Sequence, residues 1–164
     1  MTIYHPEPAD FQRITTSASD ILHKEDTETS DSANSAPSRG KRVLHTCYRV
    51  GDADRSVAFY EALGFEDRGR FPVRDEAVNV FMGLPGQDDQ LELTQNFGVE
   101  EYDHGTAYAH IAIHVPDIEA ELERLQPLGI TPEKPPFRVR EGAALIAFIR
   151  DPDGYRIELT ERPN

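Results

Sequence analysis

Two histidine and glutamate pairs recur in the chain at almost the same spacing. Glu92 follows His45 by 47 residues, and Glu158 follows His110 by 48. Imidazole nitrogens and carboxylate oxygens together form a ligand set of intermediate hardness. Such a set suits nickel, cobalt, zinc, iron or manganese better than copper(I) or calcium. One pair would supply half of the equatorial ligands of an octahedral site. Two pairs that face one centre would supply the whole equatorial set.

The sequence around these pairs repeats with the same offset. The offset is 65 between His45 and His110, between Asp52 and Asp117, and between Gly64 and Gly129, and it is 66 between Glu92 and Glu158. A fixed offset of this kind indicates an internal repeat. In each half a strand precedes an Asp that can cap a helix and a Gly that can end it, and further short strands follow. We predict an α+β fold of tandem βαβββ modules, about 43–105 and 106–162.

Strand alternation predicts which side chains share a face with the candidate ligands, because residues i and i+2 of a strand point the same way. In the first half these groups are His45, Cys47 and Arg49, and Glu92, Thr94 and Asn96; in the second half they are His110, Ala112 and His114, and Glu158 and Thr160. The ligand faces therefore also carry side chains that can contact a substrate.

Each candidate ligand has an ordinary structural alternative. A single strand histidine is usually hydrogen-bonded in a core or at a sheet edge, and a single strand glutamate is usually solvated. Because both residues recur in register with the repeat, we favour one joint metal site. Its predicted ligands are His45, Glu92, His110 and Glu158.

Other residues of ligand type fit this site less well. His114 shares the face of His110, but its counterpart in the first half is Arg49, so we predict that it stays outside the ligand set. Cys47 would break the repeat as a ligand, and we interpret it as a packed thiol. We expect His5, His23 and His104 to be surface residues.

Composition limits the class of protein. The chain has 164 residues, a formal net charge of -13 and one cysteine. The acidic balance argues against nucleic-acid and anionic-membrane partners, since both require a basic surface. No long apolar segment and no basic-then-apolar N-terminus occurs, and no internal disulfide can form. We expect a soluble, cytoplasmic protein.

The first 42 residues differ in composition from the rest. Residues 24–42 contain no apolar side chain larger than alanine or proline, so burial cannot offset the entropy cost of ordering them. We predict a largely disordered N-terminal tail over 1–42 and a domain over 43–164. Within the tail, Phe11, Ile14 and Ile21 have the spacing of a short helix, and a tail mobile throughout is the alternative.

Four motifs resemble one known family. The segments LHTCYRVGD, LELTQNFG, GTAYAHIAI and AFIRDPDGYRIELTE are similar to glyoxalase I, the lactoylglutathione lyases, within the vicinal oxygen chelate (VOC) superfamily. The resemblance covers residues 43–162. It implies the glyoxalase/bleomycin resistance/dioxygenase-like fold and the four metal ligands already named, with two waters completing an octahedron. It also implies an intertwined homodimer with each active site at the subunit interface.

The resemblance further implies a reaction. Glyoxalases I convert the hemithioacetal of methylglyoxal and glutathione to S-lactoylglutathione through a metal-stabilised enediolate, which detoxifies methylglyoxal. The family assigns proton transfer to the carboxylate that matches Glu158, with the residue that matches Glu92 as a ligand and second candidate base. Zinc-dependent relatives tend to have glutamine at the position of His45. The histidine here resembles the bacterial nickel- and cobalt-activated group, so Ni²⁺ or Co²⁺ is expected and Zn²⁺ remains an alternative.

Recognition of glutathione transfers less completely. Arg49 and Asn96 match the positions that hold the γ-glutamyl end in the family. Some relatives place an arginine for the glycine carboxylate where this chain has Thr106. The other cations available for this carboxylate are Arg138, Arg140 and Lys134. An incomplete carboxylate pocket would leave another low-molecular-weight thiol as the natural co-substrate.

Two other classes of function remain at this point. One is a different metalloenzyme of the superfamily, such as an acyl-CoA epimerase or a thiol transferase. The other is a metal-free binding protein on the same scaffold. Binders of that kind generally lack the metal ligands, so the presence of all four residues argues against it.

Overall fold

The computed structural model describes residues 42–88 and 91–163. Its elements are β1 (Thr46–Arg49), α1 (Ala53–Ala62), β2 (Glu66–Val73), β3 (Ala77–Gly83), β4 (Leu91–Asn96), β5 (Ile111–His114), α2 (Ile118–Leu125), the short 3-10 helix η2 (Gln126–Leu128), β6 (Leu145–Arg150) and β7 (Arg156–Glu161). The predicted mixture of helices and strands is confirmed. The predicted tail lies, apart from Arg42, outside the described residues, and the domain boundaries stay predictions.

The two halves share one sheet topology. The first sheet has the strand order β1-β4-β3-β2 and the second the order β5-β7-β6. In both, the first strand lies parallel to the last, and the last lies antiparallel to the strand before it. Each histidine immediately precedes the first strand of its half, and each glutamate lies in the last. The repeat therefore places a histidine beside a glutamate twice.

The second half departs from the predicted βαβββ pattern. A full β2 has no counterpart among the described residues there, where only an isolated bridge joins Phe137 to Ile146. Pro135 and Pro136 directly precede Phe137. Proline has no N–H to donate to a strand ladder, so regular pairing is interrupted at these residues, although Glu133 N beyond them donates to the Phe148 backbone oxygen at 2.8 Å.

Both helices begin in the same way. Asp52 and Asp117 are the N-caps, and their side chains accept hydrogen bonds from the backbone N–H three residues on. The strand that ends each half adds a second acceptor: Gln95 Oε1 accepts from Ala53 N at 3.1 Å, and Glu161 Oε2 accepts from Ile118 N at 3.0 Å. Each helix start is thereby tied to the strand that carries the candidate glutamate.

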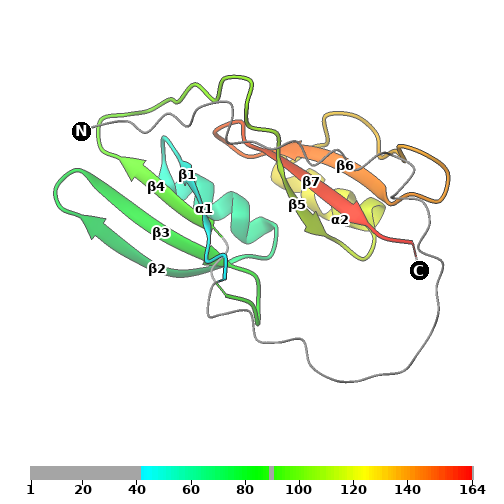
Figure 1. The fold of residues 1–164 in the computed structure, drawn as a ribbon, viewed down its shortest axis with the longest axis horizontal. Coiled ribbons are helices and arrows are strands. Elements are labelled where there is room, and N and C mark those ends of the chain that lie inside the picture. Colours follow the sequence, from blue (N-terminus) through cyan, green and yellow to red (C-terminus); the bar gives the residue numbers. More distant parts are fainter. Residues whose placement is uncertain (1–41, 89–90, 164) are drawn as a thin grey trace, which may run out of the picture. The chain divides into compact units, whose positions relative to one another are not determined.

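Each helix packs one apolar face against its sheet (Figure 1). Val57, Tyr60 and Leu63 of the first helical segment are buried, as are Ile118 and Leu125 of the second, with Leu122 half-buried. This packing fixes one side of each sheet to the core. It leaves the opposite side, with the histidines and glutamates, available for ligands.

The turn Asp151–Gly154, between β6 and β7, hydrogen-bonds to the first half. Asp153 Oδ1 accepts a hydrogen bond from Gly51 N at 2.8 Å, and Asp151 Oδ2 accepts one from Tyr60 Oη at 3.0 Å. Asp151 is buried, and burial is the main cause that raises the pKa of its carboxyl. The second half is thereby anchored to the start and middle of α1.

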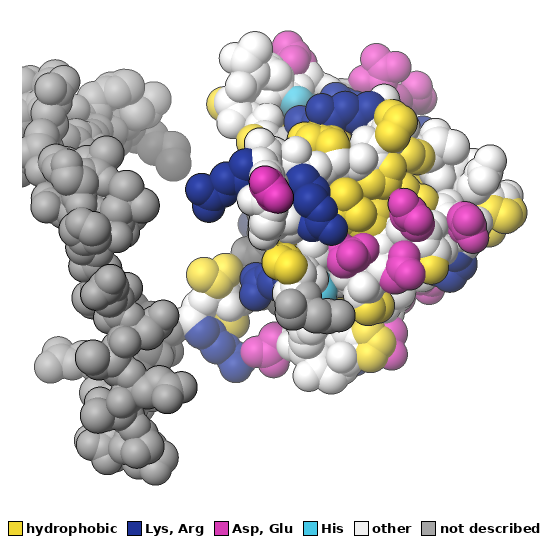
Figure 2. All heavy atoms as spheres, turned by 90° about the vertical axis from the view of Figure 1, so that its right-hand side faces the viewer, with side chains coloured by type: hydrophobic (Ala, Val, Ile, Leu, Met, Phe, Trp, Pro, Cys, Tyr) yellow, Lys and Arg dark blue, Asp and Glu magenta, His cyan; other side chains and the backbone are white. Residues whose placement is uncertain are grey.

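Surface charge is not uniform. Figure 2 shows a face on which acidic side chains border a hydrophobic patch on one side and basic side chains border it on another. The net charge of -13 is thus a sum over mixed surfaces rather than a single acidic field. In the described part of the chain, no helix is long and apolar enough to cross a membrane.

Candidate metal and substrate site

The first pair of predicted ligands lies together. His45 Nε2 is 2.9 Å from Glu92 Oε2, and the two side chains are 31% and 14% exposed. Glu92 lies opposite Phe81 in the β3–β4 register, and the Phe81 ring meets His45 edge-on with ring centroids 5.3 Å apart. The aromatic contact holds the imidazole toward the carboxylate and leaves both groups accessible.

The second pair repeats this arrangement. His110 Nε2 is 3.1 Å from Glu158 Oε2, and the two side chains are 34% and 18% exposed. Glu158 lies opposite Phe148, whose ring meets His110 edge-on at 5.4 Å between centroids. Equivalent strands, equivalent aromatic contacts and equivalent donor atoms thus make two half-sites.

The donors of each half-site fit a divalent metal. One imidazole nitrogen lies 2.9 or 3.1 Å from one carboxylate oxygen, while the second carboxylate oxygen accepts a hydrogen bond from a protein donor. An outer hydrogen bond of this kind orients a metal ligand. Among residues 42–88 and 91–163, however, no three His, Cys, Asp or Glu side chains gather at one point. Each half-site alone supplies two ligands.

The outer contacts of the two glutamates differ. Glu158 Oε1 accepts a hydrogen bond from Thr160 Oγ1 at 2.7 Å. Glu92 Oε1 accepts from Asn79 Nδ2 and lies 3.4 Å from Thr94 Oγ1. The first carboxylate therefore has an amide contact for which the second half-site has no counterpart among the described hydrogen bonds.

The other residues of ligand type lie outside the pairs. His114 is exposed, and its Nδ1 lies 3.0 Å from the Thr160 backbone oxygen. Our interpretation of Cys47 as a packed thiol is wrong: Cys47 is exposed, and its Sγ lies 3.3 Å from Thr94 Oγ1. His104 is half-buried rather than a free surface residue, because its ring stacks on Tyr155 at 4.0 Å between centroids. His5 and His23 fall outside the described residues.

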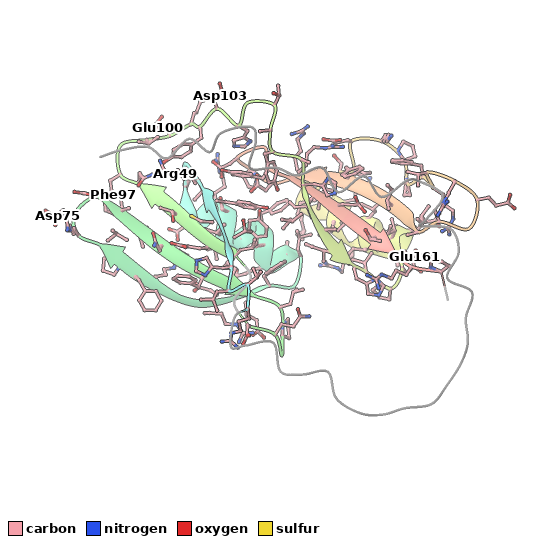
Figure 3. The ribbon with its side chains drawn as sticks, in the orientation of Figure 1. Arg49, Asp75, Phe97, Glu100, Asp103 and Glu161 are labelled. Atoms are coloured by element: carbon pink, nitrogen blue, oxygen red, sulfur yellow. The ribbon has the colours of Figure 1, made fainter. Side chains whose placement is uncertain are left out.

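The predicted γ-glutamyl contacts lie at the carboxyl ends of β1 and β4. Arg49 pairs with Thr94 in the strand register, which places Arg49, Thr94 and Asn96 on the ligand face. Arg49 is exposed, and Asn96 Nδ2 donates to Tyr102 Oη at 2.9 Å. Figure 3 shows Arg49 and Phe97 at this end of the first sheet. The two predicted contacts are thus compatible with one binding surface.

The predicted cations for the glycine carboxylate lie in the second half, before β6. Arg138 Nη1 donates to the Ala143 backbone oxygen at 2.5 Å, and Arg140 is exposed. Lys134 Nζ lies 3.6 Å from the centroid of the Phe137 ring. No described contact joins any of these three side chains to Arg49 or Asn96, so the described residues do not assemble a complete glutathione site.

Sequence reasoning missed three residues that hold the half-sites in shape. Phe81 and Phe148 lie in corresponding segments, VNVFMG and LIAFIR, but their offset of 67 is longer than the offset of the histidines. Asn79 is a polar residue within an apolar strand segment, which is a signal for a buried or semi-buried hydrogen bond. Both signals were available in the sequence.

Comparisons with known proteins agree with this geometry. Residues 42–159 match the model of the Glyoxalase/Bleomycin resistance protein/Dioxygenase superfamily. The chain therefore belongs to that superfamily.

The relatives specify a narrower group. A protein of Haemophilus influenzae named lactoylglutathione lyase is 43% identical over 128 residues, covering 73% of this chain and 92% of its own. The solved structure of Leishmania major glyoxalase I, described as trypanothione-dependent, has a TM-score of 0.63 at 39% identity and covers 74% of this chain and 86% of its own.

Plant relatives are longer. The Arabidopsis thaliana protein named probable chloroplastic lactoylglutathione lyase is 40% identical over 126 residues, which are 74% of this chain and 36% of its own. The chain thus spans about a third of the length of that relative. The family and the fold follow from the comparisons, and the activity of the whole protein is a proposal.

Proposed function

We propose that this chain is a metal-dependent glyoxalase I that converts the hemithioacetal of methylglyoxal and glutathione to S-lactoylglutathione. The observation that carries the proposal is the repeated half-site, in which His45 and Glu92 face each other as His110 and Glu158 do. The names of relatives that match along 90% or more of their own length support the same activity.

The chemistry requires one proton to move between neighbouring carbons. His45, Glu92, His110 and Glu158 would hold a divalent metal, whose positive charge would make the carbon-bound proton acidic. Glu158 takes this proton from the first carbon and returns it to the second, as a positioned general base and then acid. Glu92 stays in place as a ligand.

The complete site needs two copies of the chain. Each half-site holds two ligands, and no described group of three completes a site within one chain. Both half-sites present accessible donor atoms, with the histidines 31% and 34% exposed. A homodimer in which the first half of one chain faces the second half of its partner supplies all four ligands to each site. This arrangement has the closed two-fold symmetry usual for homodimers.

The proposal also includes the metal, the contacts to the co-substrate and the location. Two imidazoles and two carboxylates suit several divalent metals, and the resemblance to the bacterial group with a histidine at the position of His45 favours Ni²⁺ or Co²⁺, with Zn²⁺ as the alternative. Arg49 and Asn96 bind the γ-glutamyl end of glutathione, and Arg138 or Arg140 binds the glycine carboxylate. A cytoplasmic location agrees with one exposed, unpaired cysteine, because thiols stay reduced there.

Thioester formation by metal-stripped protein tests the proposal. Methylglyoxal and glutathione are supplied, and Ni²⁺, Co²⁺ or Zn²⁺ is restored in turn while ultraviolet absorbance is followed. We expect strong activity with Ni²⁺ or Co²⁺ and little with Zn²⁺. The same assay with trypanothione in place of glutathione separates the thiol from the reaction. Tight metal binding without thioester formation from either thiol would contradict glyoxalase chemistry and favour another metalloenzyme of the superfamily.

A further inference from the structure

The hydrogen bonds around Glu92 run in one direction. A carboxylate only accepts, so the amide nitrogen of Asn79 faces Glu92 and its amide oxygen faces away. Thr94 Oγ1 has one proton and two acceptors within reach, and Asn79 Oδ1 at 3.1 Å is nearer than Glu92 Oε1 at 3.4 Å, so we assign the proton to the amide oxygen. The thiol of Cys47, 3.3 Å from Thr94 Oγ1, is then left as donor to the hydroxyl. This series of hydrogen bonds thus runs from Cys47 through Thr94 and Asn79 and ends on one oxygen of Glu92.

Strand register explains why these side chains meet. Asn79 pairs with Thr94 across β3 and β4, Phe81 pairs with Glu92, and Cys47 pairs with Glu92 across β1 and β4. Asn79 and Glu92 are thus diagonal neighbours on one face, a separation that long side chains bridge. The amide is positioned by three neighbouring strands rather than by a loop.

The residues that the structure describes around the second half-site do not form such a series of hydrogen bonds. In the equivalent register Ile146 pairs with Thr160, and Ala112 pairs with Glu158. Ile146 and Ala112 occupy the places of Asn79 and Cys47, and neither side chain can donate a hydrogen bond. Within residues 42–88 and 91–163, Thr160 Oγ1 is the one hydrogen-bond donor to Glu158 Oε1.

We propose that Asn79 is a positioning residue that fixes Glu92 as the permanent carboxylate ligand. At the equivalent position diagonal to Glu158 stands Ile146, and the missing amide leaves that carboxylate free to exchange between metal binding and proton transfer. The proposal rests on the proposed function for its catalytic half, since only a reaction distinguishes a fixed carboxylate from a mobile one. Its metal-binding half stands on geometry alone.

Reciprocal substitutions test both halves. Asn79→Leu keeps the shape of the side chain and removes the amide, and Ile146→Asn places an amide beside Glu158. Ile146→Leu is the matched control. The metal dissociation constant is measured on metal-stripped protein by competition for Co²⁺ with a coloured chelator, and the Co²⁺ absorption spectrum reports the ligand geometry. Turnover and KM are then measured separately on the reloaded proteins.

Asn79→Leu is expected to raise the Co²⁺ dissociation constant about tenfold or more, the usual effect of losing an outer hydrogen bond to a metal ligand, and to change the spectrum. Ile146→Asn is expected to lower kcat about tenfold without raising KM or weakening Co²⁺ binding. Ile146→Leu is expected to change neither the Co²⁺ dissociation constant nor kcat. Should Asn79→Leu fail to fold, Thr94→Val removes the hydroxyl that orients the amide and should weaken Co²⁺ binding in the same direction.

The outcomes separate this inference from the proposed function. Unchanged Co²⁺ affinity and spectrum in Asn79→Leu, with unchanged thermal unfolding of the metal-free protein, would overturn the role of Asn79 even if the wild type is a glyoxalase. Weakened Co²⁺ binding in a protein whose wild type forms no thioester would support the role of Asn79 as a ligand support and reject the proposed reaction.

Discussion

The two half-sites have the same ligands in equivalent positions and differ in the hydrogen bonds around their glutamates. In both, a histidine precedes the first strand, a glutamate lies in the last, and a phenylalanine ring from the neighbouring strand meets the imidazole edge-on. Among the side chains that the structure describes, an asparagine and a threonine contact the far carboxylate oxygen of Glu92, whereas a threonine alone contacts that of Glu158. The repeated features set where the ligands are, and the differing ones set what each ligand does.

The aromatic contacts differ as well. Behind the first half-site, Phe81 meets Phe71, which is 56% exposed, with ring centroids 5.7 Å apart. Behind the second, the guanidinium of Arg156 lies 3.9 Å over the centroid of the Phe148 ring, and Glu133 binds Arg156 with both carboxylate oxygens. The second half-site is thus backed by a charged, hydrogen-bonded layer and the first by an accessible ring.

Replacing each glutamate in turn should give the largest difference between the two half-sites. Glu158→Gln is expected to lower kcat by about 10²–10⁴-fold, because glutamine cannot accept the substrate proton. Glu92→Gln is expected to weaken metal binding more than it lowers the turnover of the fully metallated protein. Steady-state kinetics at saturating metal and chelator competition give the two quantities. Glu119→Gln, an exposed change on α2, is the control, and equal kcat losses in both glutamate variants would remove the distinction.

Mixing two inactive variants should restore activity if each site combines halves of different chains. His45→Ala damages the first half-site and His110→Ala the second, so a mixed dimer carries one fully damaged and one intact site. Random reassociation is expected to restore about a quarter of wild-type activity, since half of the dimers are mixed and each has one working site. Partial unfolding and refolding of the mixture, followed by the thioester assay, measures this. No recovery despite mixed dimers would place each site within one chain.

The fold class was predictable from the sequence because the repeat aligned His, Asp and Gly landmarks in both halves, and the superfamily was predictable because four motifs resemble it. The pairing of His45 with Glu92 and of His110 with Glu158 was predictable as well, since alternation puts each residue on a known face. The reduced counterpart of β2 before β6 was not predicted, although Pro135 and Pro136 explain it. Periodicity reports the direction of a side chain and says little about whether a strand finds a partner.

Outer contacts were harder to predict than ligands. The amide of Asn79 lies two register positions from Glu92, and nothing local in the sequence specifies that β3 lies between β2 and β4. Cys47 was placed on the correct face but interpreted as packed, because alternation cannot tell a buried face from one that opens to solvent. Such contacts depend on sheet order, which the structure supplies.

The junction between the halves should be the main asymmetric contribution to stability. Tyr60 of α1 donates to buried Asp151, whereas the corresponding residue of α2, Leu125, is fully buried and apolar. Tyr60→Phe leaves one acceptor of Asp151 without a donor and is expected to lower the free energy of unfolding by about 1–3 kcal/mol. Urea unfolding of the metal-free protein measures this, with Tyr102→Phe as a control. A loss no larger than that of the control would show that the contact does not stabilise the junction.

Asp151 should also give the junction a pH dependence. Burial is the main cause that raises the pKa of its carboxyl in the folded chain. As pH rises through the window between the ordinary and the raised pKa, the unfolded chain loses the proton first, so the native state becomes less stable. The wild type is expected to lose stability relative to Asp151→Asn across this window and to change no further above it. Urea unfolding at a series of pH values tests this, and a constant difference between the two proteins would contradict it.

The smallest effect is expected behind the second half-site. Arg156→Leu removes the cation from the Phe148 face and one partner of Glu133, which keeps Arg150 at 2.8 Å. Because Arg156 is 32% exposed, the loss is expected to be about 0.5–1 kcal/mol of unfolding free energy. Phe71→Leu is the matched change behind the first half-site, where an exposed ring backs Phe81. If Arg156→Leu weakens Co²⁺ binding as much as Asn79→Leu, the layer behind Phe148 positions His110 as strongly as the amide positions Glu92. The two half-sites would then differ in the means of support and not in its degree.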